Sequence, residues 1–290
     1  YQYINASGAI IVSIDIPSGM MGEDNRFCSR QNIIHPALTL TLQFPKLAFF
    51  TSEECPLTGN WKILDIGLHH DIIEKEDTPY YYIQPAEVAE WIKKRERFSD
   101  KYDYGHLLVV AGSRGMAGAA SMTARAALHS GAGLVSIHSA ARCETILQTA
   151  LPEAIFEADD NENHISDIQL TRRYNSIAIG PGLGTHTDTR EAFIRLLPQL
   201  TYPIVVDADA LNLMQGNATT LSLLPRQSII TPHHREFDRL FGESTTQYER
   251  LQKAVEMSRH YQIVIVLKGA HTAIVSPEGK IYFNGTGNPG

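Results

Sequence analysis

The residues of this sequence best suited to chemistry stand in four short segments, each of which follows an apolar run. The segments are 180–184 (GPGLG), 207–210 (DADA), 231–236 (TPHHRE) and 268–272 (KGAHT). Glycine-rich turns bring backbone N–H groups close to a ligand, and carboxylate, imidazole and ammonium groups bind ligands by charge and hydrogen bonds. The four segments are therefore candidate parts of a binding site.

A fifth segment is rich in glycine. Gly112, Gly115 and Gly118 follow the apolar run His106–Ala111 and precede a helix expected over Ala119–Ser130. A helix that begins after such a turn presents unpaired N–H groups and a positive dipole end to an anion. The spacing matches neither the GxGxxG fingerprint nor a P-loop. The alternative is a tight turn that binds nothing.

The elements that must position these residues alternate between strand and helix from residue 104 onward. Strands are expected over 106–111, 134–138, 177–179, 203–206, 228–230 and 263–267, followed by a hairpin of 273–276 and 280–284. This alternation predicts an α/β domain with a mostly parallel sheet covered on both faces. Parallel strands carry the turns after them to one edge, so we expect the four segments that hold small, acidic, His or Lys residues to converge on one crevice.

Each residue also has a simpler interpretation. Asp207 and Asp209 are helix caps in that interpretation, Lys268 is a surface charge, and GPGLG is only a turn. His233 is then solvated, or caps the helix that starts near Glu236. Because all of these residues are expected at one edge of the sheet, a shared ligand site is favoured over separate structural roles for each.

The expected helix and the first strands have clear side-chain patterns. In the helix, Ala119, Met122 and Ala126 share one face. In a strand expected over 38–44, Leu38, Leu40, Leu42 and Phe44 lie on one face, and Thr39, Thr41 and Gln43 lie on the other. Such alternation is typical of a half-buried strand. A further short strand is expected over 61–66.

A second candidate site lies near the N-terminus. The apolar run Ala9–Ile16 leads into Asp15, Pro17, Ser18 and Gly19. An acid at the carboxyl end of a buried strand, followed by such a turn, stands where open α/β sheets bind ligands. The alternative is that Asp15 only caps the turn.

Composition excludes several classes of protein. The 290 residues contain 25 Lys and Arg against 32 Asp and Glu, a net charge of −7, which argues against a nucleic-acid partner. No apolar run approaches the length of a membrane span, and residues 1–14 lack the basic start of a signal peptide. Cys28, Cys55 and Cys143 are scattered, which favours a reducing cytoplasmic location. The start at Tyr1 and the end at Gly290, within a glycine-rich turn, suggest a fragment of a longer protein.

The motifs from about residue 100 onward resemble one known family. They are AGSxxMxGAA from Ala111, LPE from Leu151, GPGLG, VVDADALN, TPHxxEF, LKGAxT and a final NGTGNP. In this order they resemble the ADP-dependent NAD(P)H-hydrate dehydratases, which have a ribokinase-like fold. The resemblance covers about 100–290.

The resemblance implies roles for particular residues. Ala119, Gly184 and His233 are expected at the hydrated dinucleotide. The segment Lys268, Gly269, Ala270, His271 and Thr272 is expected to bind the phosphates of the adenine nucleotide, with the lysine as a point charge and the backbone as N–H donors. The catalytic Asp of the family follows a glycine-rich turn and is expected beyond Gly290, so no catalytic residue is assigned here.

The N-terminal motifs VSIDIPSG, ALTLTLQFPK and LDIGL resemble the C-terminal third of the NAD(P)H-hydrate epimerase domain. This resemblance implies that Asp15 contacts the hydrated nicotinamide nucleotide and that Ser18 helps to bind K⁺. The family's earlier glycine-rich substrate loop and potassium-binding Asn and Asp have no counterpart. The chain as given is therefore not expected to epimerise anything alone.

Together these observations predict a ribokinase-like, doubly wound α/β domain over 101–290, preceded by the end of a Rossmann-like epimerase domain over 1–75 and by a linker and helix over 76–100. The helix is expected over Pro85–Arg97. The implied activity is ADP-dependent dehydration of (S)-NAD(P)H hydrate, coupled in the longer protein to epimerisation of the R and S hydrates. ADP, Mg²⁺ and K⁺ are the expected cofactors, NADHX and NADPHX the substrates, and a homo-oligomer the assembly, with no nucleic-acid or membrane partner.

Two other functions stay open at this point. One is a ribokinase-like kinase that phosphorylates an alcohol without elimination. The other is a nucleotide-binding fragment with no activity.

Overall fold

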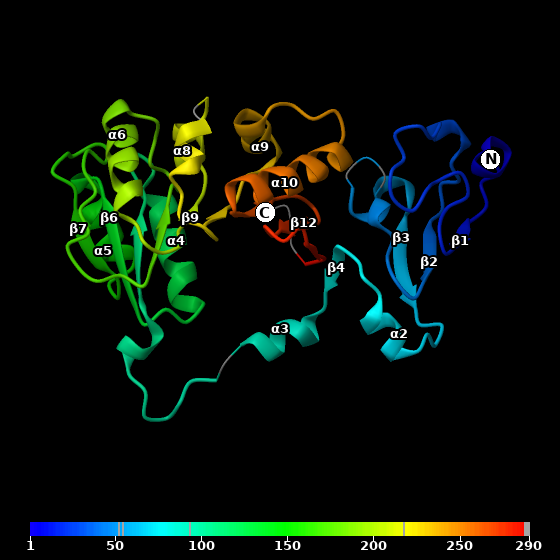
Figure 1. Cartoon of the computed structure of the whole chain (residues 1–290), viewed down its shortest axis with the longest axis horizontal. Helices are drawn as coiled ribbons and strands as arrows, with labels where there is room; N and C mark the ends of the chain where they lie inside the picture. The colour runs from blue at the N-terminus through cyan, green and yellow to red at the C-terminus, as the bar shows by residue number, and fades with distance from the viewer. Residues whose placement is uncertain (52, 54, 93, 217, 287–290) are drawn as a thin grey trace.

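In the computed structural model of the chain, the described residues are 1–51, 53, 55–92, 94–216 and 218–286, and they form two β-sheets (Figure 1). A three-stranded sheet lies beside the N-terminus, at the right of Figure 1, and a ten-stranded sheet with its helices makes up most of the remainder. No helix among these residues is both long and apolar enough to span a membrane.

The larger sheet has the strand order β4-β13-β12-β11-β10-β9-β8-β5-β6-β7. Its strands are β4 (Tyr80–Ile83), β5 (His106–Val110), β6 (Leu134–Ser139), β7 (Ile155–Ala158), β8 (Ser176–Ile179), β9 (Val205–Val206), β10 (Ile229–Ile230), β11 (Val264–Leu267), β12 (Thr272–Val275) and β13 (Ile281–Asn284). Its pairings are parallel, except that β12 runs antiparallel to β11 and β13. The prediction of a mostly parallel α/β sheet that ends in a hairpin is confirmed.

The helices that accompany this sheet are α3 (Pro85–Trp91), α4 (Ala117–His129), α5 (Glu144–Ala150), α6 (Thr187–Leu196), α7 (Asp209–Met214), α8 (Ala218–Ser222), α9 (His234–Phe241) and α10 (Gln247–Tyr261). Both faces of the sheet are covered, since neighbouring residues of β5 belong to different cores. Leu108 and Val110 pack in one hydrophobic cluster, and Val109 packs in another with the alanines of α4. This is the burial expected of a parallel strand in a doubly wound domain.

The prediction of which face of α4 is buried is wrong. Its buried residues are Ala117, Ala120 and Ala124, whereas Met122 is 71% exposed. The buried stripe has the predicted spacing but starts two positions earlier, which turns it by about 200° around the helix. Alanines on both sides of the helix allowed either face to pack, and the sheet selected the first.

The smaller sheet consists of parallel strands β1 (Val12–Ile14), β2 (Leu38–Leu42) and β3 (Asn60–Leu64), with α1 (Gln2–Asn5) before it and α2 (His70–Lys75) after it. On β2 the threonines are the buried residues. Thr39 and Thr41 are fully buried and donate hydrogen bonds to the Thr58 and Phe44 carbonyls, while Leu38 and Leu40 are partly exposed. The apolar face of this strand is therefore the more open one.

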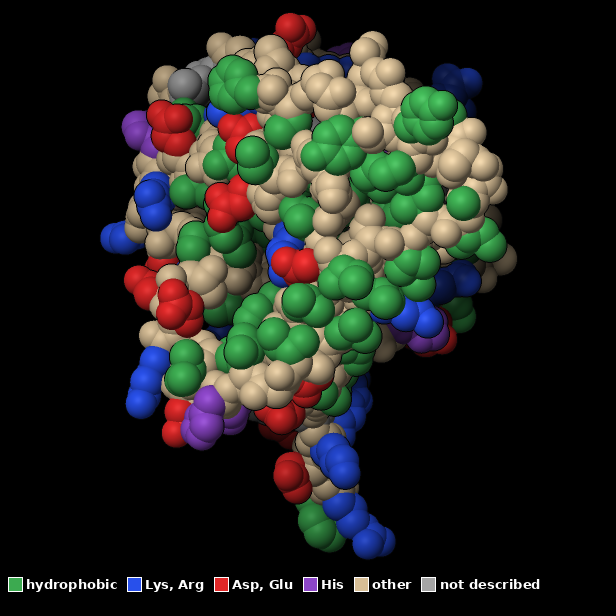
Figure 2. All heavy atoms as spheres, turned by 90° about the vertical axis from the view of Figure 1, so that its right-hand side faces the viewer, with side chains coloured by type: hydrophobic (Ala, Val, Ile, Leu, Met, Phe, Trp, Pro, Cys, Tyr) green, Lys and Arg blue, Asp and Glu red, His purple; other side chains and the backbone are tan. Residues whose placement is uncertain are grey.

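Apolar side chains are also exposed elsewhere on the smaller sheet. Ile10 and Ile14 are 86% and 74% exposed, and Ile66 is 52% exposed. Figure 2 shows hydrophobic side chains gathered on the side of the molecule where this sheet lies.

Part of the connection between the two sheets joins the larger sheet as a strand. Tyr80–Ile83, placed within the predicted linker 76–100, forms β4 and pairs in parallel with β13. Helix α3 ends at Trp91, six residues before the predicted Arg97. Phe50 stacks on Phe283 with ring centroids 4.6 Å apart, so the segment before β3 also contacts β13. The division into domains at 75 and 100 stays a prediction.

Candidate active site

The site begins where the direction of chain winding changes. β5 lies between β6 and β8, and the turns that follow β5 and β8 contact each other. Ser113 Oγ donates to the Gly182 carbonyl at 2.9 Å, and Gly112 N–H donates to the Pro181 carbonyl at 2.9 Å. Such a switch point, outside the carboxyl ends of the strands, is where open α/β sheets bind ligands.

Two glycines make the turn after β8 possible. Gly180 has φ +135°, and a Cβ there would lie 1.7 Å from the Asp207 carbonyl oxygen. A Cβ on Gly182 would lie 3.0 Å from Ala119 Cβ. Only glycine fits these positions, which explains the GPGLG sequence and places Ala119 against the loop that carries Gly184.

Asp209 holds Gly184 in place. Gly184 N–H donates to Asp209 Oδ2 at 2.9 Å, and Asn212 Nδ2 donates to Asp209 Oδ1 at 3.2 Å. The residue before it, Ala208, has φ +49° and ψ −119°, a backbone region that L-residues rarely adopt. This bend lies between Asp207 and Asp209, whose carboxylates contact different turns of the edge.

Lys268 lies between two carboxylates. Its Nζ is 2.7 Å from Asp207 Oδ1 and 4.0 Å from Glu236 Oε2, and its side chain is 40% exposed. The three residues come from the turn after β9, the start of α9 and the end of β11. The predicted convergence of these turns is confirmed for this group. Asp207 and Glu236 belong to the DADA and TPHHRE segments, but neither was assigned a role at the ligand from the sequence. Their place in the segments that follow two strands was the signal for them.

His233 caps helix α9. Its Nδ1 accepts from Glu236 N–H at 3.1 Å, and Glu236 Oε2 accepts from His233 N–H at 2.8 Å, which makes a capping box. Because Nδ1 is the acceptor, the proton of the neutral ring is on Nε2, and the side chain is 48% exposed. The capping role is thus observed, and Nε2, which lies 3.5 Å from Glu236 Oε1, is the ring nitrogen left to contact a ligand.

The rest of the KGAHT segment divides between two surroundings. Gly269 and Ala270 are exposed, and Thr272 Oγ1 donates to the Gly269 carbonyl at 3.4 Å. The His271 ring turns to the N-terminal part of the chain, with its centroid 5.2 Å from that of Phe50, and burial lowers its pKa. Its side chain is therefore not brought into the group around Lys268.

Asp15 and Ser18 follow β1 of the three-stranded sheet, whereas this edge belongs to the larger sheet. Asp15 Oδ1 accepts from Leu42 N–H at 3.0 Å and lies 2.7 Å from Lys46 Nζ. Burial alone would raise the pKa of the Asp15 carboxyl, but the bonds from Lys46 and Leu42 outweigh it and lower the pKa. The observed contacts are those of a residue that stabilises its turn. The hydroxyl-bearing Ser18 is exposed in that turn.

The edge offers groups that can bind an anion. Helix α4 begins at the switch point with no side-chain cap on its N-terminus and no acidic residue in its first turn. Its first N–H groups and its dipole are thus available to an anion. Lys268 adds a positive charge. The two carboxylates of Asp207 and Glu236 outnumber that one ammonium group, and carboxylate oxygens are suitable ligands for a divalent cation that accompanies phosphate.

Comparison with known proteins decides the family. The family described as NAD(P)H-hydrate dehydratase matches residues 107–290, and the YjeF-related protein N-terminus family matches residues 1–48. The chain belongs to the NAD(P)H-hydrate dehydratase family. The matched range contains all the groups described at the edge of the larger sheet.

Curated relatives match almost the whole chain. It is 33% identical over 297 residues to the bifunctional NAD(P)H-hydrate repair enzyme of Moorella thermoacetica, covering 99% of this chain and 56% of the relative. It is 31% identical to the enzyme of the same name from Escherichia coli, covering 100% of this chain and 54% of the relative. The chain thus spans just over half the length of these relatives.

Solved structures agree with the family on the fold. The ADP/ATP-dependent NAD(P)H-hydrate dehydratase of Bacillus subtilis, crystallised with ATP and Mg²⁺, is 33% identical, with a TM-score of 0.57 over 68% of this chain and 69% of that chain. A ribokinase-like superfamily protein from Enterococcus faecalis is 25% identical, with a TM-score of 0.63 over 74% of each chain. The predicted ribokinase-like fold is confirmed.

Proposed function

We propose that this chain carries the nucleotide and substrate sites for the dehydratase activity of a longer NAD(P)H-hydrate repair enzyme, which restores NADH or NADPH from the S hydrate at the expense of ADP or ATP. The observation that carries the proposal is the joining of the family motifs at one sheet edge. Gly184 is bonded to Asp209, and Lys268 is paired with Asp207, two residues away along the same turn.

The nucleotide is assigned to the end of β11. We propose that its phosphates contact Lys268 and the N–H groups of Gly269 and Ala270, which are exposed. The Asp207 and Glu236 carboxylates beside that lysine would hold Mg²⁺, whose charge neutralises the phosphates. Transfer of phosphate to the hydroxyl of the hydrate turns a poor leaving group into a good one.

The hydrated dinucleotide is assigned to the switch point. Ala119 and Gly184 offer surfaces with little or no side chain, so a flat ring can approach the backbone there. His233 presents Nε2–H as a donor to the ring or its amide while its Nδ1 keeps α9 capped. The two proposed ligands then meet between β8 and β11.

The N-terminal part is proposed to belong to the epimerase of the longer protein, with Asp15 at the hydrated nucleotide. Ser18 can offer K⁺ its hydroxyl and its carbonyl, which also accepts from Ile34 N–H at 3.0 Å, but one residue does not supply a complete set of oxygen ligands. No step is therefore assigned to K⁺. A homo-oligomer and a cytoplasmic location, the latter suggested by the scattered cysteines, complete the proposal.

The experiment is a product analysis with full-length protein, (S)-NADHX or (S)-NADPHX, Mg²⁺, and ADP or ATP. We expect the absorbance of reduced nicotinamide to return in proportion to the phosphate released. A stable phosphate ester without that absorbance would instead assign a small-molecule kinase. Nucleotide binding with no product of either kind would assign a binding module.

A further inference from the structure

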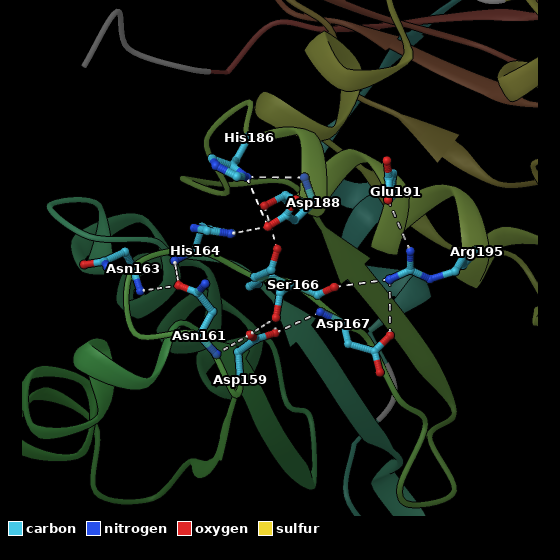
Figure 3. A network of polar contacts seen from close by, with 12 residues as sticks. Asp159, Asn161, Asn163, His164, Ser166, Asp167, His186, Asp188, Glu191 and Arg195 are labelled. Carbon is cyan, nitrogen blue, oxygen red and sulfur yellow. Dashed lines mark hydrogen bonds and ion pairs between the residues drawn. The ribbon is translucent and has the colours of Figure 1, made fainter.

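A group of metal-ligating side chains lies outside the site described above. His164 belongs to the segment 159–167 after β7, and His186 and Asp188 stand at the start of α6. Figure 3 shows the three side chains directed toward one another between that segment and the helix. None of them has a role in the proposed dehydration.

The geometry suits a transition metal. His164 Nε2 lies 3.1 Å and His186 Nδ1 lies 3.6 Å from Asp188 Oδ2, and the two imidazole rings stack with centroids 3.8 Å apart. One ligand atom of each residue lies within 4.8 Å of those of the other two. Ligands about 2.0–2.1 Å from a tetrahedral Zn²⁺ are about 3.3 Å from one another, so small side-chain rotations are sufficient.

The segment that carries His164 is held in shape by partly buried hydrogen bonds. Asp159 accepts from Asn161 N–H at 2.8 Å and from Ser166 N–H at 2.9 Å, and Asn161 Oδ1 accepts from His164 N–H at 3.3 Å. Thr189 Oγ1 of α6 donates to the Ile165 carbonyl at 2.6 Å. The backbones on both sides of the group are therefore fixed relative to each other, as a preorganised ligand set requires.

Solvent can reach the group. The side chain of His164 is 17% exposed, and those of His186 and Asp188 are 53% and 52% exposed. His186 Nδ1 also accepts from Asp188 N–H at 3.3 Å and caps α6, and an ion bound at Nδ1 would replace this contact. An ion can thus enter and keep water as its remaining ligand.

We propose that His164, His186 and Asp188 form a binding site for a divalent transition metal ion such as Zn²⁺. Two imidazoles with one carboxylate select Zn²⁺, Ni²⁺ or Cu²⁺ over Mg²⁺, which prefers oxygen ligands. The site is thus chemically distinct from the Mg²⁺ proposed with the nucleotide, and it does not depend on the proposed function.

The position gives the ion a structural effect. His186 follows Gly184 by two residues, and Arg114 N–H, in the glycine-rich turn after β5, donates to the Asn163 carbonyl at 2.8 Å. An ion held by the three side chains connects the segment 159–167 to α6 beside the two turns of the switch point. Its binding should therefore stabilise the folded chain by mass action.

The test is titration of the purified chain with Zn²⁺ against a chromogenic chelator, and with Co²⁺ followed by visible absorption. We expect one ion per chain, a rise in melting temperature with Zn²⁺, and no such rise with Mg²⁺. His186→Asn keeps a capping side chain on α6 but removes the imidazole, and His164→Ala removes the other. Each should weaken Zn²⁺ binding by more than about 100-fold, beyond the usual effect of an indirect contact.

The matched control is His129→Ala, which removes an exposed histidine in the last turn of α4 and should leave Zn²⁺ binding unchanged. The proposal is overturned if the wild-type chain binds no Zn²⁺, or if folded His186→Asn and His164→Ala bind it as tightly as wild type. Circular dichroism of each variant establishes that it is folded.

Discussion

Lys268 Nζ lies 2.7 Å from Asp207 Oδ1, and this ion pair joins the turns that follow β9 and β11. The two side chains are 40% and 32% exposed, so the pair contributes at most about 1 kcal/mol to stability. A phosphate group can therefore replace Asp207 as the partner of the ammonium group at little cost.

In the longer protein, Lys268→Ala should weaken the binding of ADP by about 1.5–3 kcal/mol, the range for a hydrogen bond to a charged group. The free energy of unfolding should change by less than about 1 kcal/mol, because the pair it breaks is exposed. Calorimetric titration with ADP and Mg²⁺ measures the first, and urea unfolding the second. Lys253→Ala, which removes a partly exposed lysine of α10 whose Nζ bonds to the Gly242 carbonyl, is the control. An unchanged Kd for the Lys268 variant would remove it from the phosphate site.

Two substitutions of His233 separate its capping role from contact with the substrate. His233→Ala removes the cap of α9 and should lower the free energy of unfolding by about 1 kcal/mol. His233→Ser keeps a capping oxygen and should stay near wild type in stability, although it also lacks the imidazole. If Nε2–H contacts the hydrate, both variants raise the KM for the hydrate and leave the affinity for ADP unchanged. Normal kinetics in both would leave the residue with its capping role alone.

Ala208→Gly should stabilise the chain by about 1 kcal/mol, because φ +49° with ψ −119° strains a residue with a Cβ and not glycine. Urea unfolding measures the change. Ala126→Gly on the exposed side of α4 is the matched control, and it should destabilise the chain by about 1 kcal/mol since that backbone is helical. A loss of stability in both variants would show that the bend at Ala208 is not strained.

The pH dependence of stability should include a contribution from Asp159. Burial alone would raise its pKa, but hydrogen bonds from His138, Asn161 and Ser166 outweigh burial and lower the pKa far below its usual range. An unfolded Asp has a pKa of about 3.9, so this contribution is complete above about pH 4 and is lost as the pH falls through the lowered folded pKa.

Asp159→Asn should therefore destabilise the chain at about pH 7, by about 1–3 kcal/mol, and the difference from wild type should shrink at about pH 3. Chemical unfolding at both pH values measures it. Asp160→Asn changes the exposed neighbour and should show no comparable difference. A difference between wild type and Asp159→Asn that does not depend on pH would contradict the assignment.

Asp15→Asn should leave dehydration of the S hydrate intact in the longer protein and abolish use of the R hydrate. Asn keeps an oxygen that can accept from Leu42 N–H, so the turn after β1 should hold while the negative charge is lost. Supplying each epimer separately measures the two activities. Loss of both would indicate that the two sheets contribute to one shared site.

Much of the site could be predicted because its signals are local. Strand ends are marked by the change from apolar runs to glycine and polar residues, and parallel strands take those ends to one edge. Gly184, Asp207 and Lys268 could thus be placed together before their contacts were known. The glycines of GPGLG could be interpreted for the same reason, because each has a positive φ that its own turn requires.

Tertiary structure alone decided which faces are buried and which distant residues meet. The alternation of β2 showed two faces, but the side that packs on the following loop is the threonine face, because Thr39 and Thr41 find carbonyl partners there. Alanines allowed α4 two orientations, and contact with the sheet selected one. Two long-range contacts could not be predicted in this way: β4 pairs with β13, and His164 meets His186 and Asp188. No periodic pattern in the sequence links the residues that meet. Local sequence determines backbone shape, whereas burial and long-range pairing depend on the rest of the chain.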